Sequence, residues 1–456
     1  MKLSRKLKVS WDIISDTKVY PIVVAAFIFT LKLMIINTPS PTLPPSECTE
    51  AKNGFPTGCG FVFDEAYYVP AARKYLAGEA VNNEHPPIAK FMIVLGILIF
   101  GDNPLGWRFF SSLMFAVSVA TVGYIAQHFT RNKFVYLTAP LFYGFDIMAF
   151  NIGQLAMLDS IALGFGLIGT LFFLKEKYRS SALFLGLALS SKTAMLFLII
   201  ALLAYKLLHS LTSDRNLLKA FNNFSYVFER TIIIIVAIFI ASLAVYDYSL
   251  NAFDNPLNHL DYILNYHSRL RYNCSEFNLP FYCIVREVKS GVVKETVVDL
   301  PMSWTVPYFS FRPAPYHVVK LSVGEEEWRP VAYWGIYSPI WWTTWVIVVT
   351  LAIQLLDLIR IREDAKAEVF LLTWIGVNYG IYFILGYLMS RWVYPFYFIP
   401  TIPALAIALP YLLGEKGFPR LVVYALLVTQ LIWFFIFFPV KNDIHIAILK
   451  LLNLPR

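Results

Sequence analysis

Three carboxylates and a histidine lie in one polar stretch of an otherwise apolar chain. Asp64 and Glu65 are adjacent, and Glu84 and His85 stand directly before Pro86-Pro87. A carboxylate within hydrogen-bond reach of a hydroxyl can act as a general base in group transfer. The proline pair fixes the chain at the start of a helix and favours its first turn. We therefore take Asp64, Glu65 and Glu84 as candidate catalytic residues and His85 as a candidate substrate-binding residue.

These residues also have plainer interpretations. An acid in a loop is most often solvated, Glu84 could simply favour the N-terminus of the helix that follows it, and His85 could be an ordinary surface histidine. If the group transferred is a sugar that leaves a phosphate, the reaction needs cations as well as a base, because cations stabilise the leaving phosphate. Arg108, Lys192 and Arg391 are the candidates, with Arg312 in a later loop as a further one. Lys192 and Arg391 could instead extend toward lipid headgroups.

The composition places these residues in a membrane protein. The chain of 456 residues is 58% hydrophobic and 15% charged, whereas soluble domains are roughly 45–50% apolar and about 25% charged. The net charge of +8 comes from short basic clusters between apolar runs. That pattern is typical of membrane topology, so we expect membrane lipids and no nucleic acid as partners.

The apolar runs predict about eleven transmembrane helices in an all-α polytopic protein. The stretch 180–208 is interrupted at Ser190-Ser191-Lys192-Thr193, and a lysine at mid-membrane is unfavourable, so two short helices are expected there. The run 88–100 is too short to span and is expected to lie on the outer surface. The remaining spans are expected at 18–37, 107–128, 134–150, 156–174, 230–249, 339–359, 366–388, 395–413 and 419–440.

The positive-inside rule orients these spans with the N-terminus in the cytoplasm, because every short basic cluster then lies on one side. Two long outside loops remain, and both are expected to be folded. We expect a multi-pass protein of the cell membrane, or of the endoplasmic reticulum if eukaryotic, with an extracytoplasmic active site. The predicted parts are a cytoplasmic N-terminus (1–17), an N-terminal membrane module (18–249) with the catalytic outer loop (38–106), a second outer loop (250–338), C-terminal membrane helices (339–440) and an outer tail (441–456).

The four cysteines form two local pairs, Cys48 with Cys59 and Cys274 with Cys283, both in segments placed outside. Disulfides persist there, although free thiols are the alternative. The seven histidines are scattered, and neither Cys-x-x-Cys nor His-Glu-x-x-His occurs. We therefore expect no cofactor and no metal site, although carboxylates could still hold a divalent ion.

The first-loop motifs resemble those of the dolichyl-phosphate-mannose protein O-mannosyltransferase family. Phe63-Asp64-Glu65 and His85-Pro86-Pro87-Ile88-Ala89-Lys90 carry the resemblance. Further similar segments follow in order: Gly106-Trp107-Arg108-Phe109, Leu158-Asp159-Ser160, Gly186-Leu187-Ala188-Leu189-Ser190-Ser191-Lys192, Phe311-Arg312-Pro313 and Ser338-Pro339-Ile340-Trp341-Trp342.

The resemblance implies a C-type glycosyltransferase (GT-C) fold, a mannosyl phosphoryl polyprenol donor and inversion at the anomeric carbon. It makes Asp64 the base or acceptor-binding acid, supported by Glu65, with Glu84 as the second acid and Arg108 as a structural or phosphate-side arginine. Two features depart from the family. Asn83 stands where the second acid is usual, and the later loop is too short for the β-trefoil domain of eukaryotic members, which suggests an archaeal or bacterial relative.

The predicted function is transfer of mannose or a similar hexose from a polyprenyl or dolichyl phosphate to a hydroxyl, most simply that of a protein Ser or Thr. A lipid or glycan acceptor is the alternative, because Glu84 partly matches the related aminoarabinose transferases. A transporter would place ionisable residues near mid-membrane and often contain repeats, which this sequence does not favour. An inactive assembly subunit is a further alternative, but the three acids together argue against it.

Overall fold

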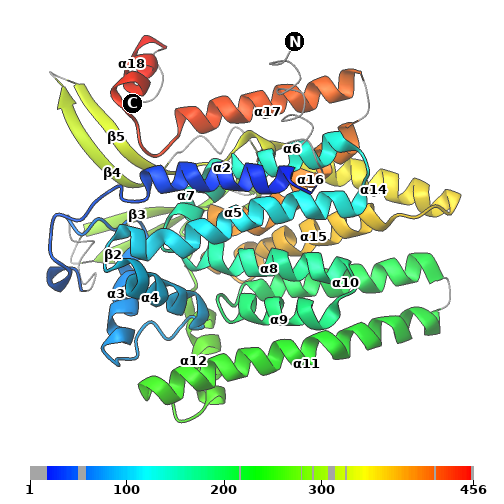
Figure 1. The fold of residues 1–456 in the computed structure, drawn as a ribbon, viewed down its shortest axis with the longest axis horizontal. Helices are drawn as coiled ribbons and strands as arrows, with labels where there is room; N and C mark the ends of the chain where they lie inside the picture. The colour runs from blue at the N-terminus through cyan, green and yellow to red at the C-terminus, as the bar shows by residue number, and fades with distance from the viewer. Residues whose placement is uncertain are drawn as a thin grey trace, which may run out of the picture.

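Long helices that lie side by side make up most of the molecule in this computed structural model, and short helices and strands gather at one end of them (Figure 1). The structure describes residues 18–49, 58–214, 217–278, 280–289, 292–306, 314–323, 326–414 and 417–452. Seven helices in these ranges are long and apolar enough to cross a membrane, or up to eight if one bent pair counts as a single span. The polytopic helical class is confirmed, and the count of eleven spans stays a prediction.

The first part of the chain is helical in the described ranges, and the bounds of its elements follow. They are α2 (Tyr20–Ile35), η1 (Pro45–Glu47), α3 (Glu65–Leu76), α4 (Ile88–Phe100), α5 (Pro104–Phe129), α6 (Lys133–Gly144), α7 (Ile147–Gln154), α8 (Leu158–Leu174), α9 (Tyr178–Leu189), α10 (Met195–Asp214) and α11 (Leu217–Leu250).

The second part contains strands as well as helices. Its helices are α12 (Pro256–Arg269), α13 (Pro301–Trp304), η2 (Pro339–Thr343), α14 (Thr344–Ile361), α15 (Lys366–Phe383), η3 (Ile384–Leu388), η4 (Pro395–Thr401), α16 (Ile402–Leu413), α17 (Phe418–Ile436) and α18 (Asp443–Leu451). Its strands are β1 (Glu276–Asn278), β2 (Tyr282–Lys289), β3 (Val292–Asp299), β4 (Ala314–Val323) and β5 (Glu326–Gly335).

The strands all lie in the second long loop, which the sequence predicted to be folded without showing how. The antiparallel sheet β1-β2-β3 has Cys283 opposite Val298, and β4 and β5 form a separate antiparallel pair. A bridge between Val331 and Val440 ties β5 to the segment before α18. The structure joins both predicted cysteine pairs as disulfides, Cys48 to Cys59 and Cys274 to Cys283.

Breaks in the predicted spans have local causes. The expected break within 180–208 is present, because α9 ends at Leu189 and α10 begins at Met195. Only α9 is short, since α10 has 20 residues and is long enough to cross a membrane. The run 134–150 differs from the single span expected for it, since α6 and α7 meet at an angle of 58°. Asp146 caps α7 by accepting a hydrogen bond from the backbone N–H of Ala149 at 2.9 Å, which begins a new helix at this point.

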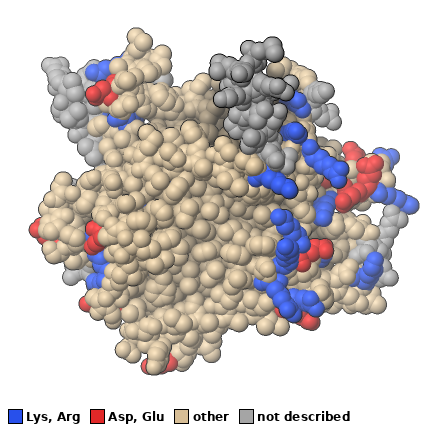
Figure 2. All heavy atoms as spheres, viewed as in Figure 1, with Lys and Arg blue, Asp and Glu red and all other residues tan. Residues whose placement is uncertain are grey.

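The charged residues mark the two ends of the bundle. Lys and Arg side chains gather at the end of the molecule that is opposite to the strands, where α10 and α14 end and α11 and α15 begin (Figures 1 and 2). Exposed basic residues in or directly beside the short connections include Arg131, Lys175, Lys177, Arg360 and Arg362. This distribution agrees with the basic clusters that the sequence placed on one side of the membrane.

Close helix packing positions the Pro86-Pro87 end of α4 on the bundle. A Cβ atom on Gly96 of α4 would lie only 2.0 Å from the backbone carbonyl oxygen of Gly106 in α5, so this approach requires glycine. The backbone N–H of Ile88 donates to the carbonyl of Ser190 at 3.0 Å. The start of α4 is thereby joined to the turn between α9 and α10.

A buried ion pair fixes the first loop to the bundle. Arg108 Nη2 lies 2.7 Å from Glu65 Oε2, and both side chains are fully buried. All five N–H donors of Arg108 are used, which is the condition under which a buried pair is tolerated. The other partners of the pair are the backbone carbonyls of Ile36, Thr38 and Gly60 and the backbone N–H groups of Val62 and Ala156.

Removal of either partner should destabilise the fold strongly. Arg108→Ala leaves the Glu65 carboxylate buried without its counterion, which is expected to lower the free energy of unfolding by about 3–5 kcal/mol. The matched control is Arg286→Ala, which removes the exposed ion pairs with Glu276 and Glu295 in the second loop and should change the stability little, because exposed ion pairs contribute little. Thermal unfolding in detergent measures both. Equal midpoints for the two variants would contradict the structural role of Arg108.

The arrangement of the loops predicts which positions share a side of the membrane. Lys175 lies in the connection between α8 and α9, and Arg360 lies in the last turn of α14. Because both are exposed at the basic end, Lys175→Cys and Arg360→Cys should react with a membrane-impermeant maleimide from the same side of sealed vesicles. Asp261→Cys in α12 and Glu295→Cys in β3 should react from the opposite side. The native cysteines are paired in disulfides and do not interfere. Labelling of all four positions from one side would contradict the predicted topology.

Candidate active site

A cavity of about 310 Å³ brings together four residues that the sequence singled out: Asp64, His85, Lys192 and Arg391. They come from four separate segments of the chain, namely the start of α3, the turn before α4, the turn between α9 and α10, and the segment between η3 and η4. Four charged or polar groups from distant segments therefore converge on one space.

Asp64 is the one acidic residue among the described residues that line this cavity. It directly precedes Glu65, so the ion pair with Arg108 also fixes its position. Phe63 has a positive φ of 54°, which is rare for an aromatic residue, and its ring packs edge-on against Phe396 of the cavity wall. Such backbone strain is common at functional sites and is compensated by surrounding contacts.

The surroundings of Asp64 suit a general base. Burial raises the pKa of Asp64 to about 6, with Lys192 opposing this shift and Asp159 adding to it. A catalytic base is most effective when its pKa lies near the working pH. Asp64 can therefore be ionised at neutral pH and still accept a proton.

Lys192 is held at the cavity by an acid that the sequence analysis did not select. Its Nζ lies 2.6 Å from Asp159 Oδ1. The same atom lies 5.4 Å from the ring centroids of both Phe396 and Tyr397. An ammonium group has three N–H donors, so two remain for a ligand. Asp159 appeared in the sequence only as part of Leu158-Asp159-Ser160. An acid at the first turn of an apolar span was the signal that could have identified it.

Two histidine rings face each other beside the cations. The centroids of His85 and His267 are 5.3 Å apart, and Arg391 Nη2 lies 3.1 Å from His267 Nδ1. Because a guanidinium only donates hydrogen bonds, Nδ1 accepts and the neutral ring carries its proton on Nε2. The second loop offers no motif around His267, so sequence reasoning missed it.

Both histidines are neutral at physiological pH. Burial and the neighbouring Arg391 lower the pKa of His267 to about 4. Burial, with Lys90 and Lys192 nearby, holds the pKa of His85 well below its usual value. The rings therefore contribute N–H donors, while Lys192 and Arg391 supply the positive charge of the site.

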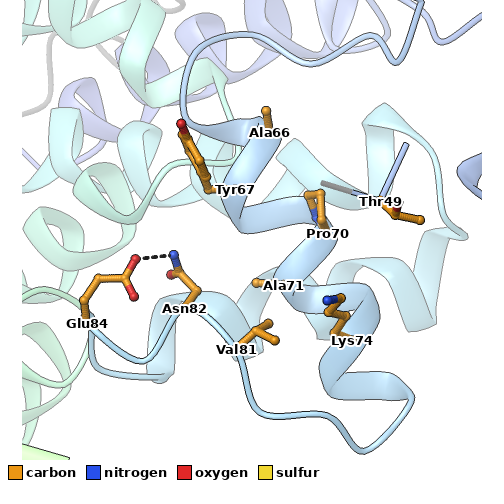
Figure 3. A pocket seen from close by; sticks show the side chains of 9 residues that line it. All are labelled: Thr49, Ala66, Tyr67, Pro70, Ala71, Lys74, Val81, Asn82 and Glu84. Carbon is orange, nitrogen blue, oxygen red and sulfur yellow. Dashed lines mark hydrogen bonds between the residues drawn. The ribbon is translucent and has the colours of Figure 1, made fainter. Parts of the chain in front are cut away.

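Glu84 lines a neighbouring pocket of about 230 Å³ and is not among the residues around the cavity. Figure 3 shows its carboxylate directed at the Asn82 side chain, whose Nδ2 donates to it at 2.6 Å. Tyr67 and Lys74 of α3 also line this pocket. Asn83, which stands where the resemblance expects the second acid, accepts a hydrogen bond from the hydroxyl of Tyr246 at 2.6 Å.

The other predicted site residues lie elsewhere. The structure does not bring Glu65 or Arg108 to the cavity, because they pair with each other in the interior. Arg312 falls outside the described residues. Within the described ranges there is no group of three or more His, Cys, Asp or Glu residues that could hold a metal ion. The cavity thus combines one proton acceptor with cations and neutral N–H donors, which suits the departure of a phosphate group.

Sequence comparisons link part of the chain to known enzymes. Residues 84–245 match the sequence model of a family described as dolichyl-phosphate-mannose-protein mannosyltransferase. The polyprenol-phosphate-mannose–protein mannosyltransferase of Mycolicibacterium smegmatis is 34% identical over 114 residues, which are 23% of this chain and 22% of that protein. The corresponding protein of Mycobacterium tuberculosis is 34% identical over 105 residues, 22% of this chain and 20% of the relative. The matches thus span about a fifth of each relative's length.

Structural comparisons extend over most of the chain. The protein O-mannosyltransferase complex of S. cerevisiae bound to its sugar donor superposes with a TM-score of 0.56 at 12% identity, covering 92% of this chain and 90% of that one. ArnT from Cupriavidus metallidurans bound to undecaprenyl phosphate gives a TM-score of 0.50 at 15% identity, covering 92% of this chain and 62% of that one. At these identities the likeness concerns the fold. The matched segment confirms the resemblance to the dolichyl-phosphate-mannose protein mannosyltransferase family over residues 84–245, and the structural likeness confirms the fold.

Proposed function

We propose that the protein transfers mannose or a similar hexose from a polyprenyl phosphate to a hydroxyl group of a protein Ser or Thr on the outer face of the membrane. The observation that carries this proposal is the cavity in which Asp64 faces Lys192 and Arg391. The names of the mycobacterial relatives, which specify polyprenol-phosphate-mannose and protein, support the donor and the acceptor.

The cavity has suitable groups for each part of such a donor. Lys192 and Arg391 bind the phosphate, and the imidazole N–H groups of His85 and His267 donate hydrogen bonds to its oxygens. The wall continues outward with Leu196 of α10 and Leu264 of α12, which are 46% and 61% exposed. Their exposure supports a path along which the polyprenyl chain extends from the cavity into the lipid.

The reaction then follows from the positions of the groups. The acceptor oxygen forms a bond to the anomeric carbon while the bond from that carbon to the phosphate oxygen breaks, which inverts the configuration. Asp64 accepts the hydroxyl proton, and the leaving polyprenyl phosphate keeps the electron pair. Lys192 and Arg391 stabilise the charge that develops on the phosphate.

The remaining predicted residues take supporting roles in this proposal. Glu65 and Arg108 hold the backbone that presents Asp64. Glu84 lines the neighbouring pocket of about 230 Å³, through which a polypeptide acceptor can approach the start of α3. Arg312 remains a predicted donor-binding residue of the second loop.

Replacement of Asp64 tests the base directly. Asp64→Asn keeps the size and polarity of the side chain but cannot accept the proton, so kcat should fall by about 10²- to 10⁴-fold. Donor binding and thermal stability should stay near those of the wild type. Glu79→Gln is the matched control, since Glu79 is an exposed acid of the same loop and should retain full activity. Transfer by Asp64→Asn at the wild-type rate would rule out this assignment.

The pH dependence of the reaction gives a second test. Burial raises the pKa of Asp64 to about 6, and only the ionised carboxylate acts as a base. The value of kcat/KM should therefore decrease as the pH falls through about 6, whereas the phosphodiester of the donor stays anionic throughout this range. Because Lys192 lowers the pKa of Asp64, Lys192→Met should move the acid limb to higher pH. If the acid limb of the pH profile stays unchanged in Lys192→Met, the ionisation that it reports is not that of Asp64.

The class of acceptor is decided by testing the two candidate acceptors side by side. A peptide containing Ser and Thr and a lipid extract are offered separately with labelled polyprenyl-phosphate mannose. The proposal expects label on the peptide. Label on the lipid fraction alone would favour the alternative transferase with a lipid or glycan acceptor.

A further inference from the structure

Helix α12 forms one wall of the cavity and presents three residues along its inner face. His259, Ile263 and His267 are spaced four residues apart, so they lie on one side of the helix. Ile263 and His267 line the cavity, and His259 and Ile263 are fully buried. At one end of this face His267 accepts a hydrogen bond from Arg391, and His259 lies at the other end.

The two ring nitrogens of His259 both have defined partners. Nδ1 lies 2.7 Å from Oδ1 of Asp247 in α11, and Nε2 lies 2.9 Å from the backbone carbonyl oxygen of Asn83. The side chains of His259 and Asp247 are only 1% and 4% exposed. This pair is part of neither the cavity lining nor the proposed chemistry.

Hydrogen-bond counting defines where the protons of this pair lie. A carbonyl oxygen only accepts, so His259 Nε2 carries a proton. The contact between His259 and Asp247 then needs a second proton, held as an imidazolium with a carboxylate or as a neutral imidazole with a carboxylic acid. Without it, a nitrogen lone pair would face a carboxylate oxygen in a buried site, which is strongly unfavourable.

The bond from His259 reaches the turn that carries His85. Asn83 precedes Glu84 and His85, and its side chain accepts from the hydroxyl of Tyr246 in α11. On the far side of the turn, Lys90 donates to the carbonyl of His85 at 2.9 Å. The turn is thus anchored to α11 and α12 through Asn83 and to α4 through Lys90.

We propose that Asp247 and His259 are positioning residues, and that the proton they share docks α12 against the His85 turn. Asp247 orients the imidazole, the imidazole holds the Asn83 carbonyl, and this contact keeps the His85 ring against the His267 ring beside the donor-phosphate site. The inference rests on the proposed function in that the phosphate site belongs to the sugar donor.

Two substitutions of Asp247 distinguish the contribution of its hydrogen bond to His259 from that of its negative charge. Asp247→Ala removes the partner of Nδ1, so the His85 turn loosens and kcat/KM should fall about 10- to 100-fold. Most of this loss should be a raised KM for the donor, with the KM for the acceptor little changed. Asp247→Asn donates an amide N–H to Nδ1 of a neutral His259, so it should recover activity to within about threefold of the wild type. Asp261→Ala, on the exposed face of α12, is the matched control and should have no effect.

Amide hydrogen exchange provides a measurement that is independent of activity. Residues 81–85 and 256–269 should exchange faster in Asp247→Ala than in the wild type, and at the wild-type rate in Asp247→Asn, while thermal unfolding shows that both variants are folded. Wild-type exchange and kinetics in Asp247→Ala, or equal loss in the two variants, would overturn the inference. If the wild type itself transfers no sugar, the proposed function fails and the exchange experiment alone decides the role of the pair.

Discussion

Glu65 and Arg108 meet in the interior where the first loop reaches the bundle, and the position of the proposed base depends on this contact. Burying two charges is unfavourable unless their attraction and further hydrogen bonds compensate for the lost hydration. The backbone around the pair provides these bonds, since Arg108 uses all its N–H donors and Glu65 also receives two backbone N–H groups. The pair therefore organises the start of α3, and Asp64 is directed to the cavity as the preceding residue.

A membrane constrains where such a site can form. Ionisable groups are unfavourable in the lipid interior, and here the break between α9 and α10 places Lys192 at the end of the bundle that carries the long loops. Asp159 at the start of α8 pairs with Lys192 from the same end. The cations lie next to exposed leucines of α10 and α12. A ligand with a charged headgroup and a long apolar chain matches this boundary between polar and apolar surfaces.

The histidines of the second loop show how a peripheral helix can complete the site. His267 is kept neutral by burial and by Arg391, which lowers its pKa, whereas His259 shares a proton with Asp247. The same side chain type thus serves as a neutral donor at one end of α12 and as a docking group at the other. The difference arises from the partners, which are a guanidinium in one case and a carboxylate in the other.

Hydropathy and local motifs were sufficient to predict the helical membrane class, the short helix at 88–100, the break near Lys192 and the candidates Asp64, His85, Lys192 and Arg391. These features are encoded in short stretches, so one sequence reveals them. The pairing of Glu65 with Arg108, the contributions of Asp159 and His267, the separate pocket at Glu84 and the strands of the second loop required the tertiary structure. Each depends on partners far apart in the chain, and the electrostatics of a buried group are determined by those partners and not by its neighbours in sequence.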